Sequence, residues 1–265
     1  MIDNILEHYN VYVSFLSKVA QFYTYCLRKD LNIFTYCNTD RHITEESISK
    51  FQIGYAPGYF KLQQFVTMNH LDENLLFETG ICKESDTGQV YDRFTHRLVF
   101  PIYDLHGNVV SFSGRLPQER PGTAKYINGP ETSVFSKSFT VYGLYQALNG
   151  QNKVNYLLVV EGNIDVVTAH QSGLQYTVAP LGTSLTDEQL LLIQSCTDKI
   201  IFCFDEDMAG KNAGVRAAEM CKQHRIENFE FLSLSGAKDI DSYIVKFGSE
   251  SIEKALNEIT NRRER

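Results

Sequence analysis

Three acidic clusters stand where apolar stretches of the sequence end. The clusters are Glu161 with Asp165, Asp205 with Asp207, and Asp239 with Asp241. In an extended segment successive side chains point to opposite sides, so Asp205 and Asp207 would lie on one side and Glu206 on the other. Carboxylates held close together repel one another unless a hard cation neutralises them, and Mg²⁺ or Mn²⁺ prefers such oxygen ligands. If the clusters converge, the pattern predicts a divalent-metal site that acts on phosphates.

The apolar stretches indicate how the clusters could converge. After Lys153, short runs rich in aliphatic, β-branched and aromatic residues alternate with helix-like segments, which is typical of a parallel α/β sheet. We predict strands at 156–160, 176–180, 199–204 and 229–234, and helices near 164–172, 186–196, 209–224 and 250–258. Ligands bind beyond the carboxyl ends of parallel strands, so carboxylates at three such ends would share one crevice.

Each cluster also has a purely structural interpretation. Asp165 could favour the positive end of its helix dipole, and Asp207 could cap the helix that follows it. Asp239 and Asp241 repeat the spacing of the second cluster, but Asp241 could equally mark a helix start. Three clusters in chain order are harder to explain by capping than any one of them alone. We therefore favour the metal site.

The composition limits the class of protein. A chain of 265 residues is long enough for one large or two modest domains, and its net charge of −7 argues against a protein that coats nucleic acid over its whole surface. The six cysteines are scattered without a spacing suited to zinc, which is typical of reduced cytosolic thiols. No apolar stretch approaches the length of a membrane span, and the first residues lack a signal-peptide pattern.

The N-terminal part differs from the rest in pattern and charge. Apolar residues recur three and four positions apart and predict a helix that ends near Lys29. Thr44 and the two acids that follow it are typical of the start of a second helix. A β-hairpin is predicted around residues 104–108. The segment 93–137 carries six basic and three acidic side chains. Its loop 117–138 could be a solvated linker, but a basic region beside an acidic metal cluster also suits a bound polyanion.

The acidic motifs resemble a known module. They are Glu161–Asp165, Phe204–Gly210 and Asp239–Asp241, and they look like the Toprim module of bacterial DnaG-type primases, type IA and II topoisomerases and some nucleases. Four earlier segments narrow the resemblance to the catalytic core of the primases: Phe51–Pro57, Tyr91–Ile102, Ser111–Arg115 and Lys125–Thr132. The chain departs from the family at Asn163, Glu206, Ala237, Lys238 and Ile240.

The resemblance implies a fold and a division into domains. The fold class is α/β, with a Toprim domain (a Rossmann-like parallel sheet) preceded by a mixed α+β basic subdomain. The expected domains are a helical and α+β basic subdomain at 1–150, the Toprim catalytic domain at 151–248, and a C-terminal helix and tail at 249–265.

The resemblance also implies a reaction. A DNA-dependent RNA primase core would make short RNA primers from nucleoside triphosphates on single-stranded DNA by metal-dependent nucleotidyl transfer. Glu161, Asp205 and Asp207 would be catalytic, with Glu161 as general base or base-side metal ligand. Two or more Mg²⁺ or Mn²⁺ ions would be held by Glu161, Asp165, Asp205, Asp207, Asp239 and Asp241. Template and nucleotide would be bound by Arg97, Arg115, Lys125, Asn128 and Lys137.

The same resemblance suggests partners for the protein and leaves alternative functions open. The zinc module and the helicase-docking domain of cellular primases are not recognisable, so we expect no zinc, weak and salt-sensitive template binding, and a replicative helicase or separate DNA-binding domain as partner. We expect a cytoplasmic protein at the replication fork and no membrane association. The alternatives are a Toprim nuclease, in which water replaces the ribose hydroxyl, and a non-catalytic module that binds single-stranded nucleic acid. A topoisomerase fits less well, because no type IA or II body accompanies the motifs.

Overall fold

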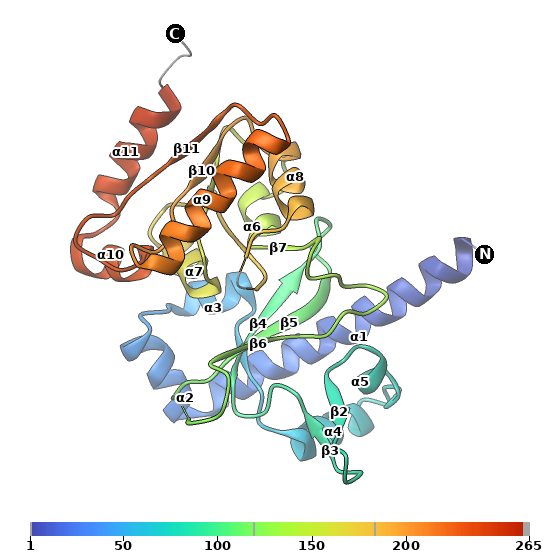
Figure 1. Cartoon of the computed structure of the whole chain (residues 1–265). Coiled ribbons are helices and arrows are strands. Elements are labelled where there is room, and N and C mark those ends of the chain that lie inside the picture. Colours follow the sequence, from blue (N-terminus) through green and yellow to red (C-terminus); the bar gives the residue numbers. More distant parts are fainter. Residues whose placement is uncertain (1, 119, 183, 262–265) are drawn as a thin grey trace. The chain divides into compact units, whose positions relative to one another are not determined.

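The computed structural model describes residues 2–118, 120–182 and 184–261, and it divides the chain into two compact units, Met1–Ser136 and Lys137–Arg265 (Figure 1). The second unit includes the elements between residues 137 and 150. The reason is that β7 (Val141–Tyr142) pairs with β9 (Thr177–Pro180), and α6 (Leu144–Leu148) packs into the core of the second unit. No helix in the described ranges is long and apolar enough to cross a bilayer.

Helices form the first part of the first unit. They are α1 (Ile2–Lys29), α2 (Leu31–Thr35), the π-helical turn η1 (Tyr36–Asp40), α3 (Glu45–Phe51), α4 (Tyr59–Met68) and α5 (Leu75–Glu78). The predicted helix end at Lys29 is confirmed. Thr44 also caps α3 as predicted, since its hydroxyl accepts a hydrogen bond from the Ser47 backbone N–H (3.2 Å). One face of α1 packs on the sheet of this unit through buried residues that include Leu16 and Tyr23.

The sheet of the first unit is antiparallel, in the order β1-β4-β5-β6. Its strands are β1 (Gly54–Tyr55), β4 (Leu98–Tyr103), β5 (Val109–Arg115) and β6 (Tyr126–Asn128), and a separate pair consists of β2 (Cys82–Glu84) and β3 (Val90–Asp92). The predicted hairpin is confirmed, because β4 and β5 flank a turn in which Asp104 accepts bonds from the backbone N–H groups of His106 and Asn108. Pairing of β6 with β5 makes residues 126–128 part of the sheet rather than a solvated linker.

Asp92, at the end of β3, is a buried carboxylate. Its side chain is 1% exposed and accepts hydrogen bonds from the Tyr23 hydroxyl (3.0 Å) and the Phe94 backbone N–H (2.7 Å). Burial raises the pKa of Asp92 to about 6 in spite of these bonds. The folded protein therefore binds this proton more tightly than the unfolded chain does. This contribution to stability is complete below about pH 4 and is lost as the pH rises through about 6, by about 3 kcal/mol in total.

We therefore expect Asp92→Asn to remove one pH-dependent part of the stability. Urea unfolding of both proteins from about pH 4 to about pH 7 gives their free energies of unfolding. The wild-type value minus the variant value should decrease by up to about 3 kcal/mol across this range. Two parallel curves would contradict the raised pKa of Asp92, whatever constant difference the substitution causes.

The second unit contains the predicted α/β sheet. Its strands follow the order β11-β10-β8-β9-β7, and β8 (Leu157–Val159), β9, β10 (Ile200–Phe202) and β11 (Phe229–Phe231) run parallel. The helices are α6, α7 (Asn163–Gln171), α8 (Asp187–Ser195), α9 (Met208–Gln223), α10 (Ile240–Phe247) and α11 (Glu250–Asn261). All four predicted strands and all four predicted helices are confirmed. The structure adds α10, which begins at Ile240 after the cap Asp239, so Asp241, the acid that we had left open as a helix start, lies in the first turn of this helix. Buried aliphatic side chains and Phe202 fill the core.

Candidate active site

The three acidic clusters follow three neighbouring parallel strands. β10 lies between β8 and β11, with Ile200 beside Leu157 on one side and Phe229 on the other. The segments that leave these strands therefore emerge at the same edge of the sheet. The carboxylates of all three clusters interact electrostatically there, as the pKa values of Asp165 and Asp205 show.

Asp205 lies at the centre of this edge. Its backbone N–H donates to Oε1 of Glu161 (2.9 Å), which joins the first cluster to the second. Burial, together with the carboxylates of Glu161 and Asp239, raises the pKa of Asp205 to about 6, while Lys238 acts to lower it. The Lys238 ammonium is 3.7 Å from Oδ2 of Asp205. The site therefore concentrates negative charge that a cation would relieve.

A tight turn sets the direction of the second cluster. Oδ1 of Asp207 accepts from the Gly210 backbone N–H (3.0 Å) and caps α9, so the structural interpretation of Asp207 also applies. Capping uses one oxygen of the carboxylate. A Cβ atom at Gly210 would lie 2.0 Å from the Asp205 backbone carbonyl oxygen, so only glycine fits here. Glu206 accepts hydrogen bonds from Ser233 Oγ (2.6 Å) and the Leu234 backbone N–H (2.9 Å).

Asp165 is bonded inside its own cluster. Its Oδ2 accepts from the Gly162 backbone N–H (3.0 Å) at the start of α7. Burial raises the pKa of Asp165 well above its ordinary value, and the carboxylates of Asp239, Asp205 and Asp241 add to this. Asp165 thus occupies the helix start foreseen by the structural interpretation, and it also faces the other two clusters.

The third cluster begins α10. Asp239 caps this helix by accepting from the Ser242 backbone N–H (2.8 Å), and Asp241 accepts from the hydroxyl of Thr168 (2.7 Å) on α7. Sequence reasoning missed Thr168. Its position three residues after Asp165 on the same helix is the signal that could have indicated it.

The donor set suits a hard divalent cation, since all six side chains offer carboxylate oxygens and two have raised pKa values from burial and mutual repulsion. In the part of the chain that the structure describes, no three His, Cys, Asp or Glu side chains lie close enough together to hold an ion as they stand. The capping bonds of Asp165, Asp207 and Asp239 hold these carboxylates at helix starts.

Two of the predicted binding arginines are buried in the first unit. The Arg97 guanidinium donates to the backbone carbonyls of Ala124 (2.8 Å) and Lys125 (3.0 Å), and so anchors the loop before β6. Arg115 donates to the hydroxyls of Tyr36 (2.6 Å) and Tyr126 (2.9 Å). Both arginines therefore organise the surface of the first unit that carries Lys125 and Asn128.

Sequence reasoning also missed a neighbouring arginine. Arg41 donates to the same Tyr36 hydroxyl (2.6 Å) as Arg115 does, so one tyrosine joins two guanidinium groups. Tyr126 is 42% exposed, and its ring centroid lies 5.6 Å from the Arg115 guanidinium carbon. Basic groups interleaved with tyrosine rings are typical of surfaces that bind single strands.

The remaining predicted binding residues are divided between the units. Lys125 is exposed and Asn128 is half-buried on β6 in the first unit. Lys137 belongs to the second unit, where its Cδ lies 3.9 Å from the position of a Cβ at Gly182, after β9. Gly182 and Glu161 both line a cavity of about 130 Å³, together with Arg216, a basic residue that the sequence did not single out.

Comparisons with known proteins agree with both units. The family "DNA primase catalytic core, N-terminal domain" matches residues 22–148, and the Toprim-like family matches residues 158–244. A structure of the DnaG primase catalytic domain bound to single-stranded DNA is 33% identical, with a TM-score of 0.84, and the match covers 95% of this chain and 82% of that one. The chain belongs to the DnaG primase catalytic core family.

Other primases support this membership. The DNA primase of Pasteurella multocida is 38% identical, and the match covers 96% of this chain and 43% of that protein. The structure of the Escherichia coli primase catalytic core is 33% identical, with a TM-score of 0.80, and the match covers 94% of this chain and 79% of that one. The chain therefore spans about two fifths of the length of that curated primase. The expected family and fold class are confirmed, and the Toprim module implies divalent-metal binding.

Proposed function

We propose that this chain is the catalytic core of a DNA primase, which makes short RNA primers from nucleoside triphosphates on single-stranded DNA. The observation that supports this proposal is the convergence of three acidic clusters at adjacent strand ends of a primase-family Toprim unit. We further propose that it acts in the cytoplasm at the replication fork, with a helicase or DNA-binding domain as partner.

The carboxylates would have distinct roles in this reaction. Two or more Mg²⁺ or Mn²⁺ ions would neutralise the triphosphate and the charge that develops during transfer. Asp205, Asp207, Asp239 and Asp241 would hold them, with Asp165 in support. Glu161 would accept the proton of the ribose 3′-hydroxyl as that oxygen attacks the α-phosphate and pyrophosphate leaves. Thr168 would orient Asp241 through its 2.7 Å hydrogen bond.

Basic and polar side chains would hold the substrates. Lys125 and Lys137 would contact phosphates of template and nucleotide, and Asn128 would add a polar contact. Arg97 would act indirectly, because its bonds to the carbonyls of Ala124 and Lys125 fix the loop that presents the Lys125 ammonium. Arg115 would hold the exposed ring of Tyr126 in place for stacking.

One assay tests the function. The chain is incubated with labelled ribonucleotides, single-stranded DNA and Mg²⁺ or Mn²⁺, and the products are separated by size. A primase should give short RNA products that depend on both template and metal. Degradation of the DNA without nucleotides would identify the Toprim nuclease instead, and DNA binding without either product would identify the non-catalytic module.

Lys125→Ala should weaken template binding and reduce its salt dependence. One lost phosphate contact lowers the slope of log affinity against log salt by about 0.7 for a single strand. The backbone carbonyl of Lys125, to which Arg97 is bonded, remains in the variant. Fluorescence anisotropy with a labelled oligonucleotide at several salt concentrations measures both effects. The control is Lys83→Ala, at an exposed position on β2. Equal salt-dependence slopes in the wild type, Lys125→Ala and Lys83→Ala would exclude a phosphate contact of Lys125.

Lys238→Glu should strengthen metal binding by the free protein. The Lys238 ammonium now competes for Asp205, and Lys238→Glu changes the local charge by two units. Each unit is worth about 1 kcal/mol beside this partly exposed pair, so the affinity for metal should rise by at least about fivefold. Isothermal titration with Mg²⁺ and the Mg²⁺-induced rise in Tm both report the change without nucleotide. Lys222→Glu, in the last turn of α9, is the control. Weaker Mg²⁺ binding by Lys238→Glu than by wild type would contradict this role.

A further inference from the structure

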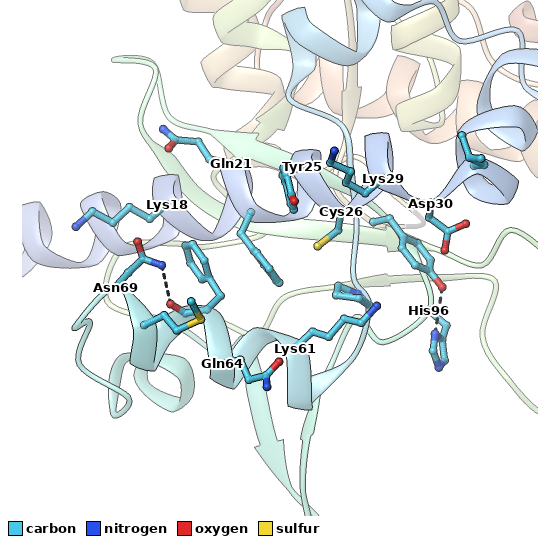
Figure 2. Close-up of a pocket in the computed structure, with 16 residues that line it drawn as sticks. Lys18, Gln21, Tyr25, Cys26, Lys29, Asp30, Lys61, Gln64, Asn69 and His96 are labelled. Carbon is cyan, nitrogen blue, oxygen red and sulfur yellow. Dashed lines mark hydrogen bonds between the residues drawn. The ribbon is translucent and has the colours of Figure 1, made fainter.

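A groove in the first unit lies between α1 and α4 (Figure 2). Its volume is about 1330 Å³. Pockets for small molecules typically enclose about 300–1,000 Å³, so this groove is large enough for a segment of polypeptide. Figure 2 shows Lys18, Tyr25 and Lys29 along α1 on one side and Lys61 and Gln64 on α4 on the other.

The two walls of the groove follow helical periodicity. On α1 the lining residues include Lys18, Phe22, Tyr25 and Lys29, three or four positions apart. On α4 the lining residues recur in the same way, from Lys61 onward. At 1.5 Å per residue, the wall from Lys18 to Lys29 is about 17 Å long, which is about three helical turns. Two helix faces of this length form a trough suited to a third helix.

The floor of the groove is aromatic and its edge is apolar. The rings of Phe22 and Phe65 stack with their centroids 4.5 Å apart, and both side chains pack on the core of the unit. Met68 is 79% exposed and Tyr25 is 59% exposed at the edge. Exposed apolar side chains that line a trough indicate a surface that another molecule covers.

Positive charge surrounds this apolar floor. Lys18, Lys29 and Lys61 line the groove, and within the described residues no ion pair joins any of them to a carboxylate. Asp30 is the acidic residue of the lining, and its carboxylate already caps α2 by accepting from the Ile33 backbone N–H (3.2 Å). In a chain of net charge −7, this groove is locally basic.

We propose that the groove binds an acidic amphipathic helix of a partner protein. Apolar side chains of that helix, spaced i, i+3, i+4 and i+7, would cover Phe22, Phe65 and Met68, and its flanking carboxylates would pair with the three lysines. A single nucleic-acid strand fits less well. The two phenylalanine rings stack on each other, and the Lys29 ammonium lies 5.6 Å from the centroid of the exposed Tyr25 ring. Met68, the most exposed large apolar side chain of the lining, offers no aromatic face for a base.

A labelled synthetic peptide tests the proposal. The probe is a three-turn helix with leucines at i, i+3, i+4 and i+7 and glutamates on both flanks, and binding to the full chain is followed by fluorescence anisotropy. We expect saturable binding that weakens at least tenfold in the double variant Lys18→Glu/Lys61→Glu and several-fold in Met68→Ser. Lys83→Glu and Phe60→Ser should bind as wild type, since Phe60 is 70% exposed on α4 but does not line the groove.

Hydrogen exchange on the wild-type chain provides a test that needs no variant. Addition of the peptide should slow exchange in α1 between Lys18 and Lys29 and in α4. The proposal is overturned if the peptide leaves both helices unchanged, or if a peptide with lysines in place of the glutamates binds equally well. It is also overturned if an oligo-dT strand, rather than the acidic peptide, loses affinity in the double variant. That result would make the groove a nucleic-acid site. These measurements use neither metal nor nucleotide, so they stand apart from the primer-synthesis assay.

Discussion

Asp205→Asn is expected to reduce ribonucleotide incorporation by at least about two orders of magnitude, the size of effect typical when one charge-stabilising group of an active site is lost. Asparagine has nearly the same shape, and the bond to Glu161 comes from the backbone N–H of residue 205. The substitution therefore removes a charge but leaves the turn intact. Because the pKa of Asp205 is raised to about 6 by burial and by Glu161 and Asp239, its loss should raise the Tm of the metal-free protein.

The adjacent carboxylate is the matched control for this experiment. Glu206→Gln should retain incorporation, because Glu206 is held by Ser233 and Leu234 rather than by the cluster, and a glutamine oxygen can accept the same bonds. Incorporation and the Tm without metal are measured for both variants. Wild-type activity in Asp205→Asn, or equal losses in both, would place the metal site elsewhere.

Gly210→Ala is expected to disturb both the fold of the second unit and its activity. The new Cβ would lie 2.0 Å from the backbone carbonyl oxygen of Asp205, which no rotation of a side chain can relieve. The first turn of α9 must therefore move, and Asp207, which caps that turn through the Gly210 N–H, moves with it. We expect the free energy of unfolding to decrease by about 1–3 kcal/mol and incorporation to be largely lost even in the molecules that remain folded.

A second glycine in the same helix isolates this effect. Gly214 has ordinary space around it, since the nearest atom to a Cβ would be on the Phe231 ring at 3.5 Å. Gly214→Ala should therefore raise the free energy of unfolding by about 0.5–1 kcal/mol through helix propensity, with activity unchanged. Urea unfolding and the incorporation assay compare the two variants. A Gly210→Ala protein as stable and active as Gly214→Ala would refute the close contact.

Local patterns in the sequence were enough to predict the features that depend on neighbouring residues. Apolar runs that end in acids predicted the strands and the sheet edge that carries Glu161 and Asp205, because the sheet itself aligns the ends of parallel strands. The cap at Thr44 and the β4–β5 hairpin were likewise predicted, since turn and cap preferences act over a few residues. The family motifs predicted the two-part architecture for the same reason, as each is a short continuous segment.

Which of these residues face solvent and which face protein depends on how distant segments of the chain pack together. Arg97 and Arg115 are basic in sequence but buried, because carbonyls and hydroxyls far along the chain or across the sheet satisfy their donors. Residues 141–148 belong to the second compact unit because β7 pairs with β9 almost forty residues later. Thr168 meets Asp241 only when α7 and α10 are packed. Burial and pairing are properties of contacts between distant residues, and local sequence patterns do not specify them.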